Sequence, residues 1–207
     1  MTVTTDGHAV SATMPFAVLR GLTGTALRAP AARWFAPAEP AEMRALELAV
    51  GPVLDIGCGP GRHVRALAER GVPALGIDIT ERALSHARGL GIPVLDRCVF
   101  DTLPGVGRWR TALLLDGNIG IGADPERLLL RTRELISPDG QILVEVEAPG
   151  EGSDPQPVSF EIDGTPGPVF EWVTIDPDGL ASIVAATGMQ LGRIWCDSTR
   201  WFGRITP

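Results

Sequence analysis

Short apolar runs alternate with longer stretches of helical spacing from residue 51 to the end of the chain. This alternation is typical of β-α-β units, so it predicts a parallel sheet covered by helices. The first five predicted strands are Val53–Ile56, Ala74–Ile77, Pro93–Leu95, Thr111–Leu115 and Ile142–Val146.

The helices and the later part of the chain carry their own signals. Thr80 is a predicted N-cap, and Asp124 and Asp176 each precede a proline that suits the first helical turn. After the fifth strand, a Gly- and Pro-rich stretch from Ala148 to Pro168 contains a short predicted strand at Val158–Ile162. The last predicted elements are a helix at Gly179–Ala186 and strands at Leu191–Cys196 and Trp201–Ile205.

The first part of the chain is rich in Ala, Thr and Pro and has weak periodicity. We expect a flexible start, a short helix from Phe16 to Leu27 and a second helix opened by Pro40. Residues 1–45 are therefore interpreted as an N-terminal appendage or lid. Residues 46–207 are interpreted as one domain with an insertion at 148–170.

The composition fits one globular core, since 44% of the 207 residues are apolar and 21% are charged. All 18 basic residues are arginine, and the chain contains no lysine and no tyrosine. Without lysine there is no Walker-A phosphate loop, Schiff-base enzyme or pyridoxal site, and the Tyr/Lys pair of short-chain dehydrogenases is excluded too. Arginine without lysine also suggests a high-GC bacterial source and an association with secondary metabolism.

The net charge of −7 argues against nucleic acid as a partner, because binding phosphates requires a clustered basic surface. Eleven acids and no base lie between Arg133 and Arg193. No apolar run approaches the roughly 18 residues of a membrane span, and Met1–Val10 contains no Lys or Arg, so neither a membrane segment nor a signal peptide is expected. Three cysteines without C-x-x-C spacing and only three histidines predict a reduced, cytoplasmic protein without a metal site.

The most informative segment is VLDIGCGPGRH, residues 53–63, in which a predicted strand, three glycines in five residues and a helix follow one another. Glycines permit a tight turn and close approach of a ligand to the backbone, and the helix N-terminus presents free N–H groups to an anionic group. Asp78 ends the next strand, 23 residues after Asp55, where a carboxylate can accept both hydroxyls of a ribose. The segment therefore predicts a nucleoside-cofactor site, and residues 57–61 are called the glycine turn below.

The spacing G-x-G-x-G after Leu-Asp-Ile resembles motif I of the class I S-adenosylmethionine-dependent methyltransferases. The resemblance extends through Gly76–Thr80, through Asp116-Gly117-Asn118 and through the PDGQILV segment near residue 140, and it covers about residues 51–147. It implies a Rossmann-like α/β fold with a seven-stranded, mostly parallel sheet, strand order 3-2-1-4-5-7-6, strand 7 antiparallel and helices on both faces. It also implies S-adenosyl-L-methionine as cofactor and S-adenosyl-L-homocysteine as product.

The resemblance implies a set of cofactor-binding residues. The glycine turn would face the methionine end of the cofactor, with Asp55 beneath it and Asp78 at the ribose. The adenine end is expected at Val99 and Phe100 or at Asp101, because Val99 stands where the family usually has an acid or amide. The full set is Asp55, Gly57, Cys58, Gly59, Gly61, Asp78, Ile79, Val99, Phe100, Asp101, Asp116, Gly117 and Asn118.

Methyl transfer from a sulfonium is an in-line displacement that depends on alignment, and it needs a base only when the acceptor loses a proton. His63 and Glu147 are the candidate bases, with a surface histidine and a solvated strand-end acid as the alternative interpretations. The segment Asp116-Gly117-Asn118-Ile119 is expected to contact the cofactor or the acceptor. The alternative interpretation is that its Asp and Asn only form a turn through Asx hydrogen bonds.

That turn lacks the proline pair of the methyltransferases that modify nucleic-acid bases and protein glutamine, so it favours a small-molecule acceptor methylated at oxygen or nitrogen. An acidic rim after the fifth strand would favour neutral or amine acceptors, although plain solubility explains the same charges.

Two other functions are compatible with the sequence. One keeps the fold and the cofactor without methyl transfer, as in a binding or regulatory protein or an enzyme that uses the sulfonium for another reaction. The other is a nicotinamide-dependent oxidoreductase, against which the glycine spacing and the missing Tyr/Lys pair argue. The sequence predicts neither the oligomeric state nor the identity of the acceptor.

Overall fold

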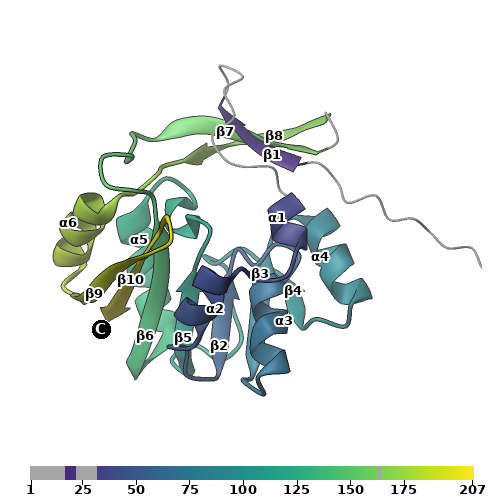
Figure 1. The fold of residues 1–207 in the computed structure, drawn as a ribbon, viewed down its shortest axis with the longest axis horizontal. Helices are drawn as coiled ribbons and strands as arrows, with labels where there is room; N and C mark the ends of the chain where they lie inside the picture. The colour runs from purple at the N-terminus through teal and green to yellow at the C-terminus, as the bar shows by residue number, and fades with distance from the viewer. Residues whose placement is uncertain (1–16, 22–31, 163–164) are drawn as a thin grey trace, which may run out of the picture.

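The computed structural model describes residues 17–21, 32–162 and 165–207, and its strands form two sheets (Figure 1). The larger sheet consists of β2 (Val53–Ile56), β3 (Ala74–Asp78), β4 (Val94–Asp96), β5 (Trp109–Leu114), β6 (Ile136–Val146), β9 (Gln190–Asp197) and β10 (Arg200–Thr206), in the order β4-β3-β2-β5-β6-β10-β9. The smaller sheet consists of β1 (Ala17–Gly21), β7 (Gln156–Ile162) and β8 (Thr165–Trp172), in the order β1-β7-β8.

The larger sheet has the predicted topology. Strands β2 to β6 are parallel, and β10 runs antiparallel to both β6 and β9. Numbered along the chain, the seven strands have the order 3-2-1-4-5-7-6 with the seventh antiparallel, so the predicted fold is confirmed. β6 begins earlier than expected, at Ile136, which pairs with Trp109 ahead of a register shift.

Helices cover both faces of the larger sheet. They are α1 (Ala32–Phe35), α2 (Pro40–Leu46), α3 (Arg62–Glu69), α4 (Glu81–Gly89), α5 (Pro125–Leu135) and α6 (Pro177–Thr187), with a short 3-10 helix η1 (Asn118–Gly120). Apolar residues of α2 and α3 pack on one face, against Leu113 and Leu143, whereas those of α5 and α6 pack on the other, against Leu114 and Val144. Successive strand residues thus point to opposite faces, and both faces are buried. Among the described residues, no helix has the length and apolar character needed to cross a membrane.

Two of the three predicted N-caps act through their side chains. Asp124 accepts a hydrogen bond from the N–H of Arg127 at 3.0 Å, and Asp176 accepts one from Gly179 at 2.8 Å. Thr80 occupies the N-cap position of α4, but the side chain of Asp78 accepts its backbone N–H at 2.7 Å. The end of β3 is therefore held to the start of α4 by the acid that the sequence assigns to the cofactor.

The predicted helix from Phe16 to Leu27 is wrong over residues 17–21, which are its only described residues. Residues 17–21 form β1, which pairs antiparallel with β7 from Ala17 opposite Ile162 to Gly21 opposite Val158. The backbone groups of this weakly periodic segment are satisfied by a strand far away in the sequence, which a local pattern does not reveal. Residues 22–31 and the expected flexible start lie outside the described residues.

The sequence pattern predicts no strand at Thr165–Trp172, the segment that forms β8 and contains Pro166, Gly167 and Pro168. β8 lies at the edge of the smaller sheet, where a proline without an N–H removes no interior hydrogen bond. β8 pairs with β7 as an antiparallel hairpin, so the insertion predicted after the fifth strand carries two strands.

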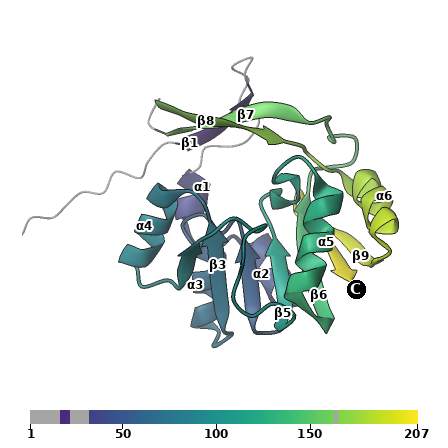
Figure 2. The same ribbon diagram turned by 180° about the vertical axis from the view of Figure 1, so that it is seen from behind.

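The smaller sheet lies across the carboxyl ends of the parallel strands (Figures 1 and 2). The end of β8 contacts the residue that follows η1, because Ile121 and Trp172 form an isolated antiparallel β-bridge. A Cβ atom on Gly120 would lie only 2.0 Å from the carbonyl oxygen of Val173, so only glycine fits at this contact. The smaller sheet thus faces the carboxyl edge, where ligands bind in open α/β sheets.

Candidate functional site

The glycine turn connects β2 to α3 at this edge. The N–H groups of Gly57 and Cys58 both donate to the carbonyl oxygen of Ile77, at 2.9 and 3.0 Å. Gly57, Gly59 and Gly61 all have positive φ, at 71°, 52° and 82°. No described atom lies within 4 Å of where a Cβ atom on Gly59 would stand, so space is open beside the backbone at the tip of the turn.

Asp78 and Asn118 attach neighbouring strand ends to the glycine turn. Asp78 accepts the N–H of Gly59 at 2.8 Å through one oxygen and that of Thr80 at 2.7 Å through the other. The side-chain amide nitrogen of Asn118 donates hydrogen bonds to the carbonyl oxygens of Ile56 and Gly57, both at 2.9 Å. The structure therefore brings together the predicted residues at the ends of β2, β3 and β5.

Eight ionisable side chains form a second feature beside the glycine turn, here called the charge cluster. Its members are Arg33, Glu42, Asp55, Arg62, His63, Asp116, Glu145 and Arg200. Arg62 donates to Glu42 at 2.9 Å and to both oxygens of Asp116 at 2.7 Å. Arg200 donates to both oxygens of Glu145, at 2.8 and 2.6 Å, and also forms an ion pair with Glu42.

His63 lies between two carboxylates of this cluster. Its Nδ1 atom is 3.6 Å from Asp55 Oδ2, and its Nε2 atom is 3.7 Å from Glu42 Oε1. Burial alone would lower the pKa of His63, but its interactions with the Asp55 and Glu42 carboxylates outweigh burial and raise the pKa to about 9. With His63 protonated, four carboxylates face three guanidinium groups and one imidazolium, so the buried charges balance.

The same partners lower the pKa values of two acids. Burial would raise the pKa of Glu42, but His63, Arg62 and Arg200 bring it down to about 2. Burial likewise opposes ionisation of Asp116, yet Arg62, His63 and Arg33 hold its pKa well below the usual range. Both carboxylates are therefore ionised at neutral pH. A buried acid stays ionised only when positively charged partners compensate its charge.

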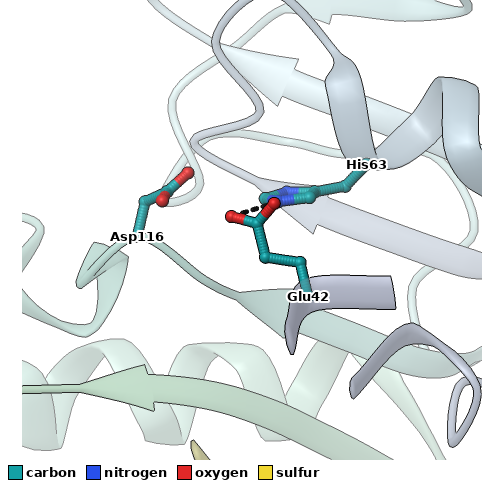
Figure 3. A group of neighbouring side chains, drawn as sticks. All are labelled: Glu42, His63 and Asp116. Carbon is teal, nitrogen blue, oxygen red and sulfur yellow. Dashed lines mark ion pairs between the residues drawn. The ribbon is translucent and has the colours of Figure 1, made fainter. Parts of the chain in front are cut away.

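Glu42, His63 and Asp116 could in principle hold a metal ion, since one ligand atom from each lies within 4.8 Å of the others (Figure 3). The guanidinium of Arg62, however, already forms ion pairs with both carboxylates. A divalent cation would have to displace that guanidinium and deprotonate His63. Within the described residues, the arrangement fits an internal ion-pair network better than a metal site.

The family model for a methyltransferase domain matches residues 53–94 of this chain. An uncharacterized methyltransferase of Schizosaccharomyces pombe is 57% identical over 35 residues, which are 17% of this chain and 24% of that protein. The chain therefore matches only about a quarter of the length of such curated relatives.

Solved structures align over much more of the chain. A S-adenosylmethionine-dependent methyltransferase from Bacteroides fragilis, in complex with S-adenosyl-L-homocysteine, is 24% identical with a TM-score of 0.75, covering 92% of this chain and 87% of that one. The chain has the class I methyltransferase fold.

Two further methyltransferase structures show the same fold at lower similarity. The CcbJ methyltransferase from Streptomyces caelestis is 17% identical, with a TM-score of 0.63 over 84% of this chain and 91% of that one. The 1,6-didemethyltoxoflavin-N1-methyltransferase of Burkholderia thailandensis, with bound 1,6-didemethyltoxoflavin and S-adenosylhomocysteine, is 21% identical, with a TM-score of 0.57 over 81% and 76%.

The remaining predicted residues of the methyltransferase fold lie around the glycine turn without joining the charge cluster. Cys58 is buried, its thiol lies against Gly76, and burial raises the pKa of that thiol, so it is not a reactive thiolate. Ile79 follows Asp78 and is 71% exposed. Gly117 has a φ of 72° and forms the N-cap of η1.

The segment after β4 is fixed to α5. Arg131 donates to the carbonyl oxygens of Val99 and Asp101, at 3.0 and 2.8 Å. The guanidinium of Arg127 stands over the ring of Phe100, 4.3 Å from its centroid. The Asp101 carboxylate accepts the N–H of Cys98 at 3.2 Å.

The two candidate bases lie in different surroundings. His63 is 3% exposed and enclosed by the charge cluster, which differs from the surface histidine of the alternative interpretation. Glu147 directly follows β6 at the carboxyl edge, and its N–H donates to the carbonyl oxygen of Ile175 at 2.8 Å.

The sequence interpretation missed five members of the charge cluster: Arg33, Glu42, Arg62, Glu145 and Arg200. Glu42 carried one usable signal, because it lies with Ala41, Ala45 and Leu46 on the buried face of α2. An acid on an apolar helix face indicates a buried cationic partner. The partners of Glu42 come from α3 and β10, and no local spacing connects them.

Proposed function

We propose that this protein is an S-adenosylmethionine-dependent methyltransferase that acts on a small molecule. The observation that carries the proposal is the glycine turn, which leaves open space at Gly59 and is held by Asp78 and Asn118 at the carboxyl edge of a class I methyltransferase fold. The fold alone does not establish an activity, but this turn supplies the backbone approach that a nucleoside cofactor requires.

The residues present fit that cofactor. Space is open beside the backbone at Gly59, and the buried Asp55 carboxylate, with Oδ2 3.6 Å from Nδ1 of His63, supports the turn from beneath. We propose Asp78 for the ribose hydroxyls, the turn at Gly57 and Gly59 for the methionine end, and the segment around Phe100 for the adenine. When bound, the cofactor supplies a sulfonium methyl group for in-line displacement.

Alignment is the main contribution that we assign to the protein. A general base must be unprotonated at the working pH, whereas the pKa of about 9 keeps His63 protonated at neutral pH. We therefore propose a structural role for His63, and we retain Glu147, which follows β6 at the carboxyl edge, as the candidate base for acceptors that lose a proton.

A small-molecule acceptor, methylated at oxygen or nitrogen, is supported by three observations. The smaller sheet covers the carboxyl edge, which limits the room for a macromolecule. The stretch between Arg133 and Arg193 contains eleven acids and no base, which disfavours polyanions. The Burkholderia thailandensis enzyme of the same fold carries a small molecule beside S-adenosylhomocysteine. We further propose the part of residues 1–45 that precedes α2 as a lid, because α2 itself packs in the core of the domain. We also propose a cytoplasmic, bacterial setting, which is consistent with three free cysteines.

The direct test is an acceptor screen scored for release of S-adenosyl-L-homocysteine. The purified protein is incubated with S-adenosyl-L-methionine and, separately, with phenols, amines, carboxylic acids and a DNA oligonucleotide at physiological salt. Acceptor-dependent release with a phenol or an amine supports the proposal. Release with the oligonucleotide alone would contradict a small-molecule acceptor. No release with any acceptor, from protein that binds the cofactor, would favour a binding or regulatory role.

A further inference from the structure

The two edge strands of the larger sheet differ in how open they are to another chain. One edge is β4, which has only three residues, and a short edge strand offers little backbone for pairing. The other edge is β9, which has eight residues and contains neither proline nor lysine (Figures 1 and 2). Among the described residues, β9 pairs only with β10. Alternate backbone N–H and C=O groups of β9 therefore point away from the sheet, where a further strand can add.

The regular part of β9 is short and carries apolar side chains that are not fully covered. The register with β10 shifts ahead of Ile194, and pairing is then continuous up to Asp197, which lies opposite Arg200. Within this part, Ile194 and Trp195 are half-buried and Cys196 is exposed. Because neighbouring residues of a strand point to opposite faces, an added strand would cover apolar surface on both faces of the sheet.

Two opposite charges lie on one face of β9, on either side of Trp195. The guanidinium of Arg193, an exposed residue, stands over the Trp195 ring, 5.6 Å from its centroid. The Asp197 carboxylate forms an ion pair with Arg44 of α2, so it lies on the face that α2 covers, where Trp195 also packs. A carboxylate has lone pairs for more than one donor group, so Asp197 can accept a second guanidinium. With Arg193 two residues before Trp195 and Asp197 two residues after it, the segment is self-complementary in charge.

We propose that two copies of this chain pair antiparallel through β9, with the two-fold axis at Trp195 and Arg193 of each copy opposite Asp197 of the other. Residues that lie opposite each other in an antiparallel pair share a face, as these two do, and opposite charges in such positions stabilise the pair. A two-fold axis at Arg193 or at Asp197 would instead place like charges opposite each other. An axis at any other residue of the segment would separate the two charges. The charge pattern therefore selects one register.

This arrangement is compatible with an independent site in each copy. The two strands would lie side by side in one continuous sheet and run in opposite directions, so the two-fold axis would be perpendicular to that sheet. The carboxyl edges of the two copies would then point in opposite directions, and neither glycine turn would lie in the interface. The inference does not depend on the proposed function. Because only a few residues of each copy meet, the dimer should be reversible and at the weak end of protein interfaces.

Sedimentation velocity of the full chain, at concentrations from about 1 to 200 μM, tests the interface. The wild-type protein should change from monomer to dimer within this range. Arg193→Glu places an acid opposite Asp197 of the other copy and should weaken dimerisation by at least about tenfold. The control Arg108→Glu makes the same change of charge at an exposed residue just before β5, and it should leave dimerisation unchanged.

A mixture of two variants tests the register itself. Arg193→Glu alone and Asp197→Arg alone each place like charges opposite each other, so each should stay monomeric. Mixed in equal amounts, every new charge meets an opposite one, and a heterodimer should form. Circular dichroism checks that both variants are folded, since Asp197→Arg also loses the ion pair with Arg44.

Three results would overturn the proposal. The first is a wild-type protein that remains monomeric at the highest concentration. The second is a dimer that Arg193→Glu does not weaken, and the third is a mixture of the two folded variants that stays monomeric. If Asp197→Arg does not fold, the comparison of wild type, Arg193→Glu and Arg108→Glu still decides whether this edge forms the interface.

Discussion

The glycine turn and the charge cluster lie side by side at the carboxyl edge, but different interactions hold them in place. The turn is fixed by hydrogen bonds to backbone groups, with positive φ at three glycines and one amide, Asn118, bridging to it. The cluster is fixed by ion pairs among buried and half-buried side chains from α1, α2, α3, β2, β6, β10 and the turn after β5. The turn should therefore respond to changes of shape, and the cluster to changes of charge.

The largest effect is expected from Glu42→Gln, which removes a fully buried charge while keeping the shape of the side chain. Glu42 forms ion pairs with Arg62, His63 and Arg200, and the variant would leave an excess of buried positive charge. We expect a loss of about 3–5 kcal/mol in the free energy of unfolding, measured with urea. The control Glu69→Gln, in an exposed pair with Arg65, should cost less than about 1 kcal/mol. Similar costs for the two variants would contradict a cluster held by charge.

The next effect is a dependence of stability on pH that comes from His63. Its folded pKa of about 9 lies above the ordinary 6.5, so its stabilising contribution is complete below pH 6.5 and is lost as the pH rises through 9. That contribution amounts to at most about 3 kcal/mol. The free energy of unfolding, measured with urea across this pH range, should decline less for His63→Gln than for the wild type, because the variant lacks the contribution of His63. The exposed His86 provides the control, and His86→Gln should keep the wild-type profile. Parallel profiles for wild type and His63→Gln would mean that His63 is neutral in the folded protein.

The smallest of these effects separates shape from backbone strain in the glycine turn. Gly57 and Gly71 have nearly the same φ, 71° and 72°. A Cβ atom at position 57 would stand 2.6 Å from the amide nitrogen of Asn118, whereas none of the described atoms lies within 4 Å at position 71. The left-handed backbone conformation should lower the free energy of unfolding of both alanine variants by about 1–2 kcal/mol. The close contact with Asn118 should lower it by about 1–3 kcal/mol more in Gly57→Ala alone. Equal losses in urea unfolding would show that Asn118 does not hold the turn in this position.

The sequence predicted the larger sheet and the glycine turn because both are encoded in short, contiguous patterns. Residues 53–63 contain strand, turn and helix start together, and Asp78 follows at a fixed distance set by one β-α-β unit. The charge cluster was not predicted because Arg33, Glu42, Glu145 and Arg200 meet only when α1, α2, β6 and β10 are assembled. The helix wrongly predicted over residues 17–21 and the missed β8 have the same origin, since β1 and β8 depend on pairing with β7.

The central claim is that the glycine turn binds S-adenosylmethionine, and thermal unfolding with ligands tests it most directly. The protein is unfolded alone and with S-adenosyl-L-methionine, S-adenosyl-L-homocysteine or NAD, after mass spectrometry has shown that no cofactor remains from purification. Ligand at about 100 times its Kd stabilises the folded state by about 2.7 kcal/mol, which should raise the Tm of a domain of this size by roughly 5–10 °C. We expect this rise with the two S-adenosyl compounds and not with NAD. No rise with either S-adenosyl compound, or a rise with NAD alone, would contradict the account.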